Sequence, residues 1–317
     1  MIRKRLQLTI ITLLLILTGG FSGTATAAGV NPLVSTKWLA GHLGDKNLVL
    51  IDVRTVTNYG VGHLPGAVNM PYAKFEPMSE DDSCRLMPSP ADLTALLRGL
   101  GVNASSHVVV YDQGNTASDA TKGAASCWIL EAMGMNNVSY LDGGFTKWTF
   151  EGRIIDNKKP VPKAGDFTAK LDPAKLATLK EVRAAVKAKN VILLDARSAD
   201  QHFGATKSGE VERFGHIPGS LDMPAPYLTN AGINRAPAYL KAKKVLAAIA
   251  SGIGLTKNKN AEIIVYCNSG QFAGLDYFVL HRILGYKNVS VFDGSMMEYA
   301  SHEKLPLVRF AWGHVNK

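Results

Sequence analysis

Short apolar runs alternate along this chain with longer stretches in which apolar residues recur at helical spacing. Residues 261–266 (AEIIVY) form one such run, and the pattern is typical of a buried strand. Residues 272–284 have helical periodicity that ends at Gly285, and residues 90–100 and 240–250 have similar spacing. This alternation predicts an α/β fold, in which a mainly parallel sheet is covered by helices on both faces.

Four motifs occur twice in the same order. The first set is 50–54 (LIDVR), 62–71 (GHLPGAVNMP), 108–112 (VVVYD) and 141–145 (LDGGF), and the second is 193–197 (LLDAR), 215–224 (GHIPGSLDMP), 264–267 (IVYC) and 291–295 (VFDGS). Asp195 follows Asp52 by 143 residues, which is too long for a solenoid unit and suits a duplicated domain. We therefore predict two domains of the same α/β type.

The N-terminal residues 1–28 have the pattern of a secretory signal peptide. Basic residues 3–5 precede an apolar stretch, and the small residues 25–27 form a cleavage site. A retained membrane anchor is the alternative, but the apolar stretch is short for a span of about 20 residues. We expect a periplasmic or secreted protein with no membrane contact after cleavage.

The repeats divide the remaining chain into two domains and a linker. The first domain is expected at 29–155, a polar, proline-containing linker at 156–165 and the second domain at 166–317. We expect a monomer.

The net charge of +9 falls to +6 once the signal is removed. Lysine and arginine residues are scattered and lack interleaved aromatic residues, so no nucleic-acid partner is expected. A basic surface suits a small anionic substrate. The sequence contains no Cys-x-x-Cys pair and no Cys/His cluster at metal-ligand spacing, so no metal site is predicted.

Cys267 follows the predicted strand 261–266 directly and precedes a predicted helix. Backbone amides of such a loop and the helix dipole favour a thiolate, and can lower a cysteine pKa from about 8.5 toward roughly 3.5 to 7.5. A buried structural cysteine is the alternative. The amides expected around the sulfur are those of Asn268, Ser269, Gly270, Gln271 and Phe272.

The first repeat has Asp112 where the second has Cys267. A carboxylate cannot hold a transferable sulfur, so the chemistry is assigned to the second domain and the first is expected to support it. Asp112 is either a second catalytic group or an anion held by loop amides. We expect Cys267 to be a free thiol, while Cys84 and Cys127 either form a disulfide or stay free.

Together the duplicated motifs resemble the tandem-domain rhodanese family, the thiosulfate and 3-mercaptopyruvate sulfurtransferases. The resemblance rests on Asp-x-Arg, Gly-His-Ile/Leu-Pro-Gly, the strand that ends in Cys267, and the segment from Asp142 to Trp148. It implies that Cys267 takes sulfur from an anionic donor as a persulfide and passes it to cyanide or a thiol. It also implies that no metal or organic cofactor is needed.

The resemblance places Arg197 of the second Asp-x-Arg motif near the active site, where a guanidinium binds sulfonate or carboxylate oxygens. Arg213 lies in a segment that the first repeat lacks, and is either a second substrate ligand or a surface charge. Asp52, His63 and His216 are expected to be structural, because each histidine belongs to a tight glycine turn.

The loop sequence leaves the sulfur donor open. Residues 267–272 (CNSGQF) match neither the thiosulfate pattern, with a basic residue after the cysteine, nor the mercaptopyruvate pattern Cys-Gly-Ser-Gly-Val-Thr. A phosphatase or arsenate reductase needs Cys-x5-Arg, and the sixth residue after Cys267 here is Ala273. A non-enzymatic persulfide carrier or sulfur-binding module is the remaining alternative.

Overall fold

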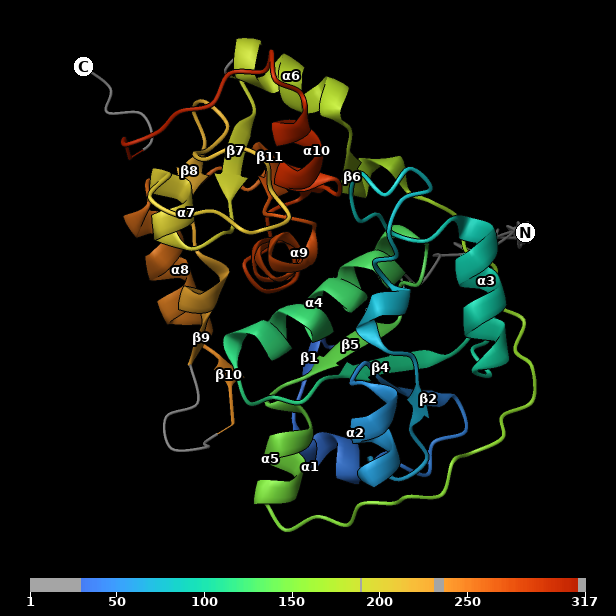
Figure 1. Ribbon diagram of the computed structural model, residues 1–317. Coiled ribbons are helices and arrows are strands. Elements are labelled where there is room, and N and C mark those ends of the chain that lie inside the picture. The colour runs from blue at the N-terminus through green and yellow to red at the C-terminus, as the bar shows by residue number, and fades with distance from the viewer. Residues whose placement is uncertain (1–29, 189, 231–236, 313–317) are drawn as a thin grey trace, which may run out of the picture.

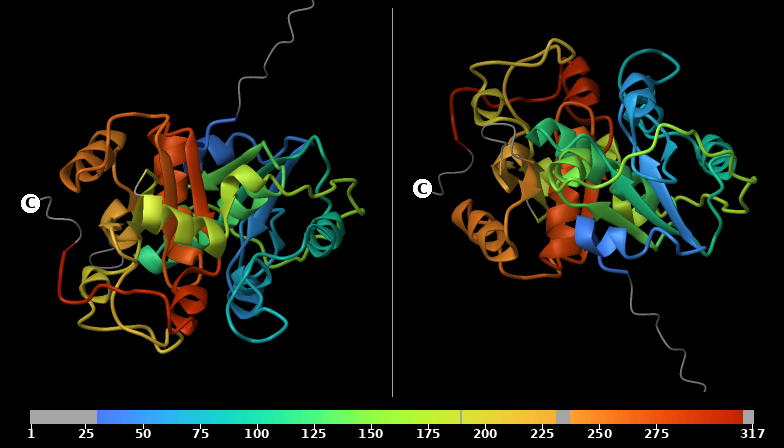
Figure 2. Two further views of the ribbon diagram at one scale, coloured as in Figure 1. Left: turned by 90° about the horizontal axis from the view of Figure 1, so that it is seen from above. Right: turned by 90° about the horizontal axis from the view of Figure 1, so that it is seen from below.

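The computed structural model describes residues 30–188, 190–230 and 237–312. The expected signal peptide lies outside these residues. Two five-stranded sheets form the core of two halves, which are coloured blue to green and yellow to red (Figure 1 and Figure 2). In the described part of the chain, no helix is long and apolar enough to span a membrane.

The two sheets have the same strand order, β1-β5-β4-β2-β3 and β6-β12-β11-β7-β8, and all their strand pairs are parallel. The first sheet contains β1 (Leu33–Val34), β2 (Leu48–Asp52), β3 (Val68–Asn69), β4 (His107–Tyr111) and β5 (Val138–Leu141). The second contains β6 (Leu176–Ala177), β7 (Ile192–Asp195), β8 (Leu221–Asp222), β11 (Glu262–Tyr266) and β12 (Asn288–Phe292). The predicted duplicated α/β fold is confirmed.

Helices cover the sheets. The first domain has α1 (Thr36–Ala40), α2 (Val56–Val61), α3 (Pro90–Gly99), α4 (Ala117–Ala132), α5 (Gly144–Phe150) and the 3-10 turn η1 (Tyr72–Lys74). The second has α6 (Leu179–Ala188), α7 (Ala199–Phe203), α8 (Lys243–Gly252), α9 (Gln271–Tyr277), α10 (Ser295–Ser301) and the short turns η2 (Pro173–Lys175) and η3 (Ala225–Leu228).

Two helices differ in detail from the sequence expectation. The helix expected at 272–284 is α9 followed by a π-helical segment, η5 (Phe278–Ile283). The helix expected at 240–250 begins later, at Lys243, because β10 (Tyr239–Leu240) pairs in an antiparallel manner with β9 (Thr229–Asn230).

The two domains pack through α4 and α9, which lie side by side at the centre of the molecule (Figure 1). A Cβ on Gly274 would lie 2.5 Å from the Cα of Ala125, so α9 approaches the backbone of α4 closely at this point. One hydrophobic cluster contains Val110 of the first domain together with Val265 and Cys267 of the second. The domain interface is therefore part of the core.

A buried ion network reinforces this interface around Glu131 of α4. Its carboxylate accepts from Arg282 at 2.7 Å and Tyr277 at 3.1 Å, and lies 2.9 Å from Lys175. Burial raises the pKa of Glu131, but the His281 hydrogen bond and the charges of Arg282 and Lys175 outweigh burial and hold it well below its usual range. The network joins α4 to the segment that follows α9.

The segment expected as the linker, residues 156–165, runs along the outside of the first domain (Figure 1). At its start Asp156 and His63 exchange two backbone hydrogen bonds of 2.8 Å, and at its end the Gly165 N–H donates to the Arg98 carbonyl at 2.9 Å. The segment is thus fixed to the first domain at both ends.

All three cysteines are buried and free, so Cys84 and Cys127 do not form the disulfide that the sequence left open. Cys127 lies in α4 and packs in the same hydrophobic cluster as Cys267, whereas Cys84 packs against residues of the second domain.

Candidate active site

The strand β11 delivers Cys267 to its carboxyl end, where only 2% of the residue is exposed. The Gly270 N–H donates to Sγ at 3.2 Å, and the Cys267 N–H donates to Oγ of Ser295 at 3.1 Å. Parallel pairing of β7 with β11 sets Asp195 beside Tyr266, one residue before the thiol. The sulfur therefore sits in a turn that is fixed from both sides.

Gly270 enables this turn because its φ of +97° lies in the region that favours glycine. A Cβ there would also meet two carboxyl oxygens, at 3.0 Å from Oδ1 of Asp293 and 3.1 Å from Oε1 of Glu76. Glu76 belongs to the first domain, so a residue of each domain closes over the Cys267 loop.

The electrostatics of the thiol differ from the sequence expectation. Burial raises the pKa of Cys267 to about 11, although the backbone N–H groups of Ala273, Ser269 and Phe272 act in the opposite direction. The neighbouring carboxyl of Glu76 raises it further. The predicted fall in pKa is therefore wrong for the resting site, because loss of solvation outweighs the amides of the loop.

Some of the backbone amides expected around the sulfur are found there. Gly270, Ser269 and Phe272 act on it as expected, and Ala273 is an addition. Two other loop residues act through their side chains. The Asn268 amide donates to Oε1 of Gln201 at 3.0 Å, and the Gln271 amide donates to Oγ1 of Thr121 at 2.6 Å.

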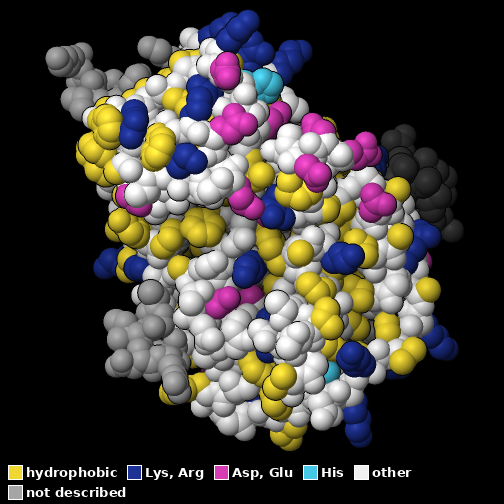
Figure 3. Space-filling model, in the orientation of Figure 1, with side chains coloured by type: hydrophobic (Ala, Val, Ile, Leu, Met, Phe, Trp, Pro, Cys, Tyr) yellow, Lys and Arg dark blue, Asp and Glu magenta, His cyan; other side chains and the backbone are white. Residues whose placement is uncertain are grey.

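A cleft of about 450 Å³ lies between the domains beside the loop. Figure 3 shows acidic and basic side chains close together in the middle of this face, where the domains meet. The charged residues that line the cleft are Arg54, Glu76, Arg85, Asp112, Asp119, Lys122 and Glu210, and the Cys267 loop contributes Ser269 and Gln271. All the cations among these residues belong to the first domain.

Arg197 is buried in an ion pair below the loop. Its Nε and Nη2 donate to the Asp195 carboxylate at 2.9 and 2.7 Å, and Nη2 also donates to the Gly215 carbonyl at 2.9 Å. Only 1% of the residue is exposed. This geometry is that of a structural ion pair, and substrate binding by Arg197 stays a prediction.

Arg213 caps the C-terminal end of α10. Its guanidinium donates to the carbonyls of Ala300 at 2.7 Å, His302 at 2.8 Å and Leu305 at 2.8 Å. The structure thus commits this side chain to a helix end rather than to the Cys267 loop, and its role in substrate binding also stays a prediction.

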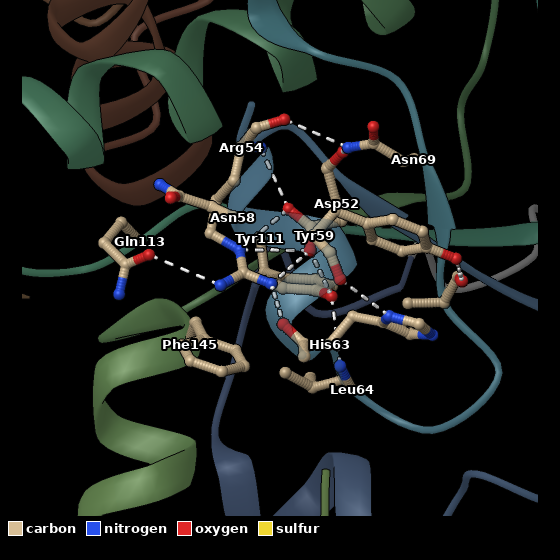
Figure 4. A network of polar contacts seen from close by, with 12 residues as sticks. Asp52, Arg54, Asn58, Tyr59, His63, Leu64, Asn69, Tyr111, Gln113 and Phe145 are labelled. Carbon is tan, nitrogen blue, oxygen red and sulfur yellow. Dashed lines mark hydrogen bonds and ion pairs between the residues drawn. The ribbon is translucent and has the colours of Figure 1, made fainter. Parts of the chain in front are cut away.

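The first domain repeats the Arg197 arrangement (Figure 4). Arg54 pairs with Asp52 at 2.6 Å, and its Nη1 donates to Oε1 of Gln113 at 3.3 Å. In the second domain the corresponding atoms, Nη1 of Arg197 and Oδ1 of Asn268, are both buried without a hydrogen-bond partner. The hydrogen bond between the arginine and the loop side chain is therefore made in the first domain and not in the second, which carries the thiol.

Asp112 occupies the position of the thiol in the first domain. Its Oδ2 accepts from the Tyr140 hydroxyl at 2.8 Å, and burial raises its pKa to about 7 even though this hydrogen bond lowers it. Asp112 is thus held by the Tyr140 hydroxyl and the Gly114 backbone, and it also lines the cleft.

The two turn histidines make local contacts, as expected of structural residues. His63 is hydrogen-bonded to the Tyr59 carbonyl at 3.0 Å and stacks on the ring of that residue. His216 is hydrogen-bonded to the His202 carbonyl at 2.7 Å and stacks on the ring of that residue in the same way.

Sequence reasoning missed the part of the site that comes from residues 72–89 of the first domain. Glu76 and Arg85 line the cleft, and the Met87 N–H donates to Oδ2 of Asp293 at 2.7 Å. Burial raises the pKa of Asp293 to about 7, and this hydrogen bond acts in the opposite direction. No periodicity marks these residues, so only the fold brings them to Cys267.

Two α/β domains of the same strand order, with a buried cysteine at the carboxyl end of a central strand of the second, define the class of protein to which the chain belongs. A model of the rhodanese-like domain matches residues 35–151 and 178–302. The chain therefore belongs to the rhodanese family, with two domains in tandem, as the motifs predict.

Bacterial relatives give the class of reaction. The chain is 30% identical to the 3-mercaptopyruvate sulfurtransferase of Escherichia coli strain K12, over 86% of this chain and 96% of that protein. It is 29% identical to the thiosulfate sulfurtransferase of Pseudomonas aeruginosa, over 85% and 94% of the two chains. The crystal structure of SseA, a 3-mercaptopyruvate sulfotransferase from Escherichia coli, matches with a TM-score of 0.71 at 28% identity, over 84% and 98% of the chains. The protein is a sulfurtransferase.

Proposed function

We propose that the protein is exported and transfers sulfane sulfur from thiosulfate or 3-mercaptopyruvate to cyanide or a thiol through a persulfide on Cys267. The observation that carries the proposal is the Gly270 N–H directed at Sγ at 3.2 Å, in a loop at the edge of a cleft that contains cations. Amides in this arrangement stabilise negative charge on a thiolate and on a persulfide. The cations suit an anionic donor.

The reaction proceeds in two displacements. The Cys267 thiolate attacks the outer sulfur of the donor, and the bond from that sulfur to the rest of the donor breaks. The electron pair leaves with sulfite, or with the enolate of pyruvate, which takes up a proton. A cyanide ion or a thiolate then attacks the outer sulfur of the persulfide and releases Cys267 as thiolate.

The cleft suggests how the donor is held. Of the three cations that line it, Arg54 and Arg85 are already paired with Asp52 at 2.6 Å and Glu210 at 3.1 Å, which leaves Lys122 as the cation of the first domain that would hold the sulfonate or carboxylate of the donor while its sulfur faces the second. This assignment gives the domain without the thiol a role in recognition.

The main test is a set of sulfur donors with cyanide or dithiothreitol as acceptor, applied to wild type and Cys267→Ser. We expect release of sulfite or pyruvate by wild type and loss of at least about 1000-fold in the variant. Transfer that survives Cys267→Ser would overturn the persulfide mechanism. The ratio of the two products identifies the preferred donor.

A persulfide carrier is the second candidate, favoured by the loop sequence of residues 267–272, which matches neither the thiosulfate nor the mercaptopyruvate pattern. A carrier would load one sulfur per chain and then stop in the presence of small acceptors. Mass spectrometry of the loaded protein, followed over many minutes with excess donor and cyanide, separates this outcome from continued turnover.

Export rests on the signal pattern of residues 1–28. Fractionation of bacterial cells that express the full chain should place a shortened protein outside the cytoplasm. A chain that lacks residues 2–28 should remain in the cytoplasm at its full translated mass. Retention of the uncleaved full chain in the membrane would support the anchor instead.

A further inference from the structure

Glu76 is a carboxyl group of the first domain that lies beside the Cys267 loop of the second. It follows η1, and 3% of the residue is exposed. Its Oε1 is buried without a hydrogen-bond partner and lies 3.1 Å from the position of a Cβ on Gly270, the residue whose N–H contacts Sγ at 3.2 Å. The carboxyl and the thiol therefore flank the same glycine.

Negative charges on Glu76 and Cys267 repel each other. Burial raises the pKa of Glu76 well above its ordinary value, and the charge of Glu76 adds to the effect of burial on Cys267. The other groups that act on this carboxyl are Tyr72, Arg85, Glu210 and Asp293. Such a site accommodates one negative charge more readily than two.

This coupling gives a way to form a thiolate at low cost. Above the raised pKa of Glu76 the carboxyl is ionised, and transfer of the Cys267 proton to it only moves a charge that is already present, whereas loss of the proton to solvent adds a buried charge. The N–H groups of the loop then face the new thiolate. The carboxyl makes no direct hydrogen bond to Sγ, so the proton crosses through one water molecule or through the donor in the cleft that Glu76 lines.

We propose that Glu76 carries the proton in the sulfur-transfer step, taking it from Cys267 and returning it to the leaving group; this rests on the proposed function. With 3-mercaptopyruvate, a bond forms between the Cys267 sulfur and the donor sulfur, and the carbon–sulfur bond breaks with its electron pair on carbon. Glu76 returns the proton to that carbon to give pyruvate, and the donor's own thiol proton stays on the persulfide. The carbon is reduced as the sulfur is oxidised, so no other reactant is needed.

Through Glu76 the first domain takes part in the chemistry. The first domain has Asp112 in place of the nucleophile, but its Glu76 supplies a titratable group next to the Cys267 loop of the second domain. A domain that only supported the fold would not need a buried carboxyl oriented at the Cys267 loop.

The test compares two readings on Glu76→Gln, with Glu80→Gln as the control because Glu80 is exposed in the same segment. The first is kcat/KM for the donor between pH 5 and 10, and the second is the rate at which iodoacetamide alkylates Cys267. We expect Glu76→Gln to lower kcat/KM about 100-fold at pH 7 and to move the acidic limb of the profile to higher pH. Alkylation should become several-fold faster, because the repulsion that raises the pKa of Cys267 is gone.

If Glu76 carries the proton, Glu76→Gln lowers kcat/KM and raises the rate of alkylation. A purely electrostatic or structural residue would not change the two quantities in opposite directions. If kcat/KM and alkylation rise together, or if kcat/KM is unchanged, Glu76 carries no proton. Glu76→Asp keeps a carboxyl and should recover part of the lost activity even if Glu76→Gln unfolds. A wild type that releases neither sulfite nor pyruvate would overturn the proposed function and this step with it, whereas an active wild type with an equally active Glu76→Gln overturns this step alone.

Discussion

The side-chain amide of Gln271 donates a hydrogen bond of 2.6 Å to the hydroxyl of Thr121, across the interface between the two domains. Gln271 is the first residue of α9 and directly follows Gly270, whose N–H contacts the Cys267 sulfur. Thr121 lies in α4 of the first domain. The position of the amides around the sulfur is therefore set in part by the domain that lacks the thiol.

Thr121→Val should weaken turnover with little loss of folded protein. The substitution keeps the shape of the side chain and removes a hydroxyl that accepts from Gln271 and donates to the Ser118 carbonyl at 2.8 Å within α4. The bond to Gln271 contributes about 1 kcal/mol, or roughly fivefold in kcat/KM if it acts only on the loop. Steady-state kinetics and thermal unfolding measure the two effects. Thr149→Val is the matched control, because Thr149 is exposed on α5 and bonds only to its own helix. Equal losses in both variants would show that Thr121 does not act through the loop.

Gly274→Ala should destabilise the protein through the contact of α9 with α4. The added Cβ would lie 2.5 Å from the Cα of Ala125, so the helices must move apart at a cost of about 1 to 3 kcal/mol. Gly252→Ala in α8 is the control, because a Cβ there meets nothing within 4 Å. Urea unfolding should show a lower midpoint for the first variant and an unchanged or higher midpoint for the second. A stable Gly274→Ala protein would mean that the interface can adjust.

The periodicity, the duplicated motifs and the position of Cys267 could all be read from the sequence, because each depends on residues close together in the chain. Glu76 could not, because its contact with the Cys267 loop spans two domains and its own segment has no regular pattern. The direction of the Arg197 and Arg213 side chains was also hidden. The Asp-x-Arg motif gives the spacing of the charges, but only packing shows that the guanidinium of Arg197 points at Asp195.

The two arginines should differ in what their removal costs. Arg197→Ala leaves Asp195 as a buried charge without its main partner and should cost about 3 to 5 kcal/mol of stability. Arg213→Ala removes hydrogen bonds to the end of α10 and should cost about 1 to 2 kcal/mol while the folded variant keeps its KM for the donor. Denaturant unfolding measures the loss of stability, and steady-state kinetics test whether Arg213 binds the donor, which the sequence left open. A folded Arg213→Ala with a KM raised tenfold or more would restore Arg213 as a substrate ligand.

Glu131 should make the stability of the protein depend on pH below neutrality. Its pKa in the folded state is held well below the value of about 4.3 expected in the unfolded chain, so its contribution is complete above about pH 4.3 and is lost progressively as the pH falls from there to the lower pKa of the folded state. Glu131→Gln leaves Arg282 and Lys175 without their shared partner and should cost about 3 to 5 kcal/mol at pH 7. Unfolding measured from pH 3 to pH 8 should show that the difference in the free energy of unfolding between wild type and variant, the gap, narrows toward acid pH.

Glu151→Gln is the control. It breaks a more exposed pair with Arg153 and should cost at most about 1 kcal/mol. A gap for Glu131→Gln that stays constant with pH would show that the carboxylate charge contributes nothing to the interface between α4 and the residues that follow α9.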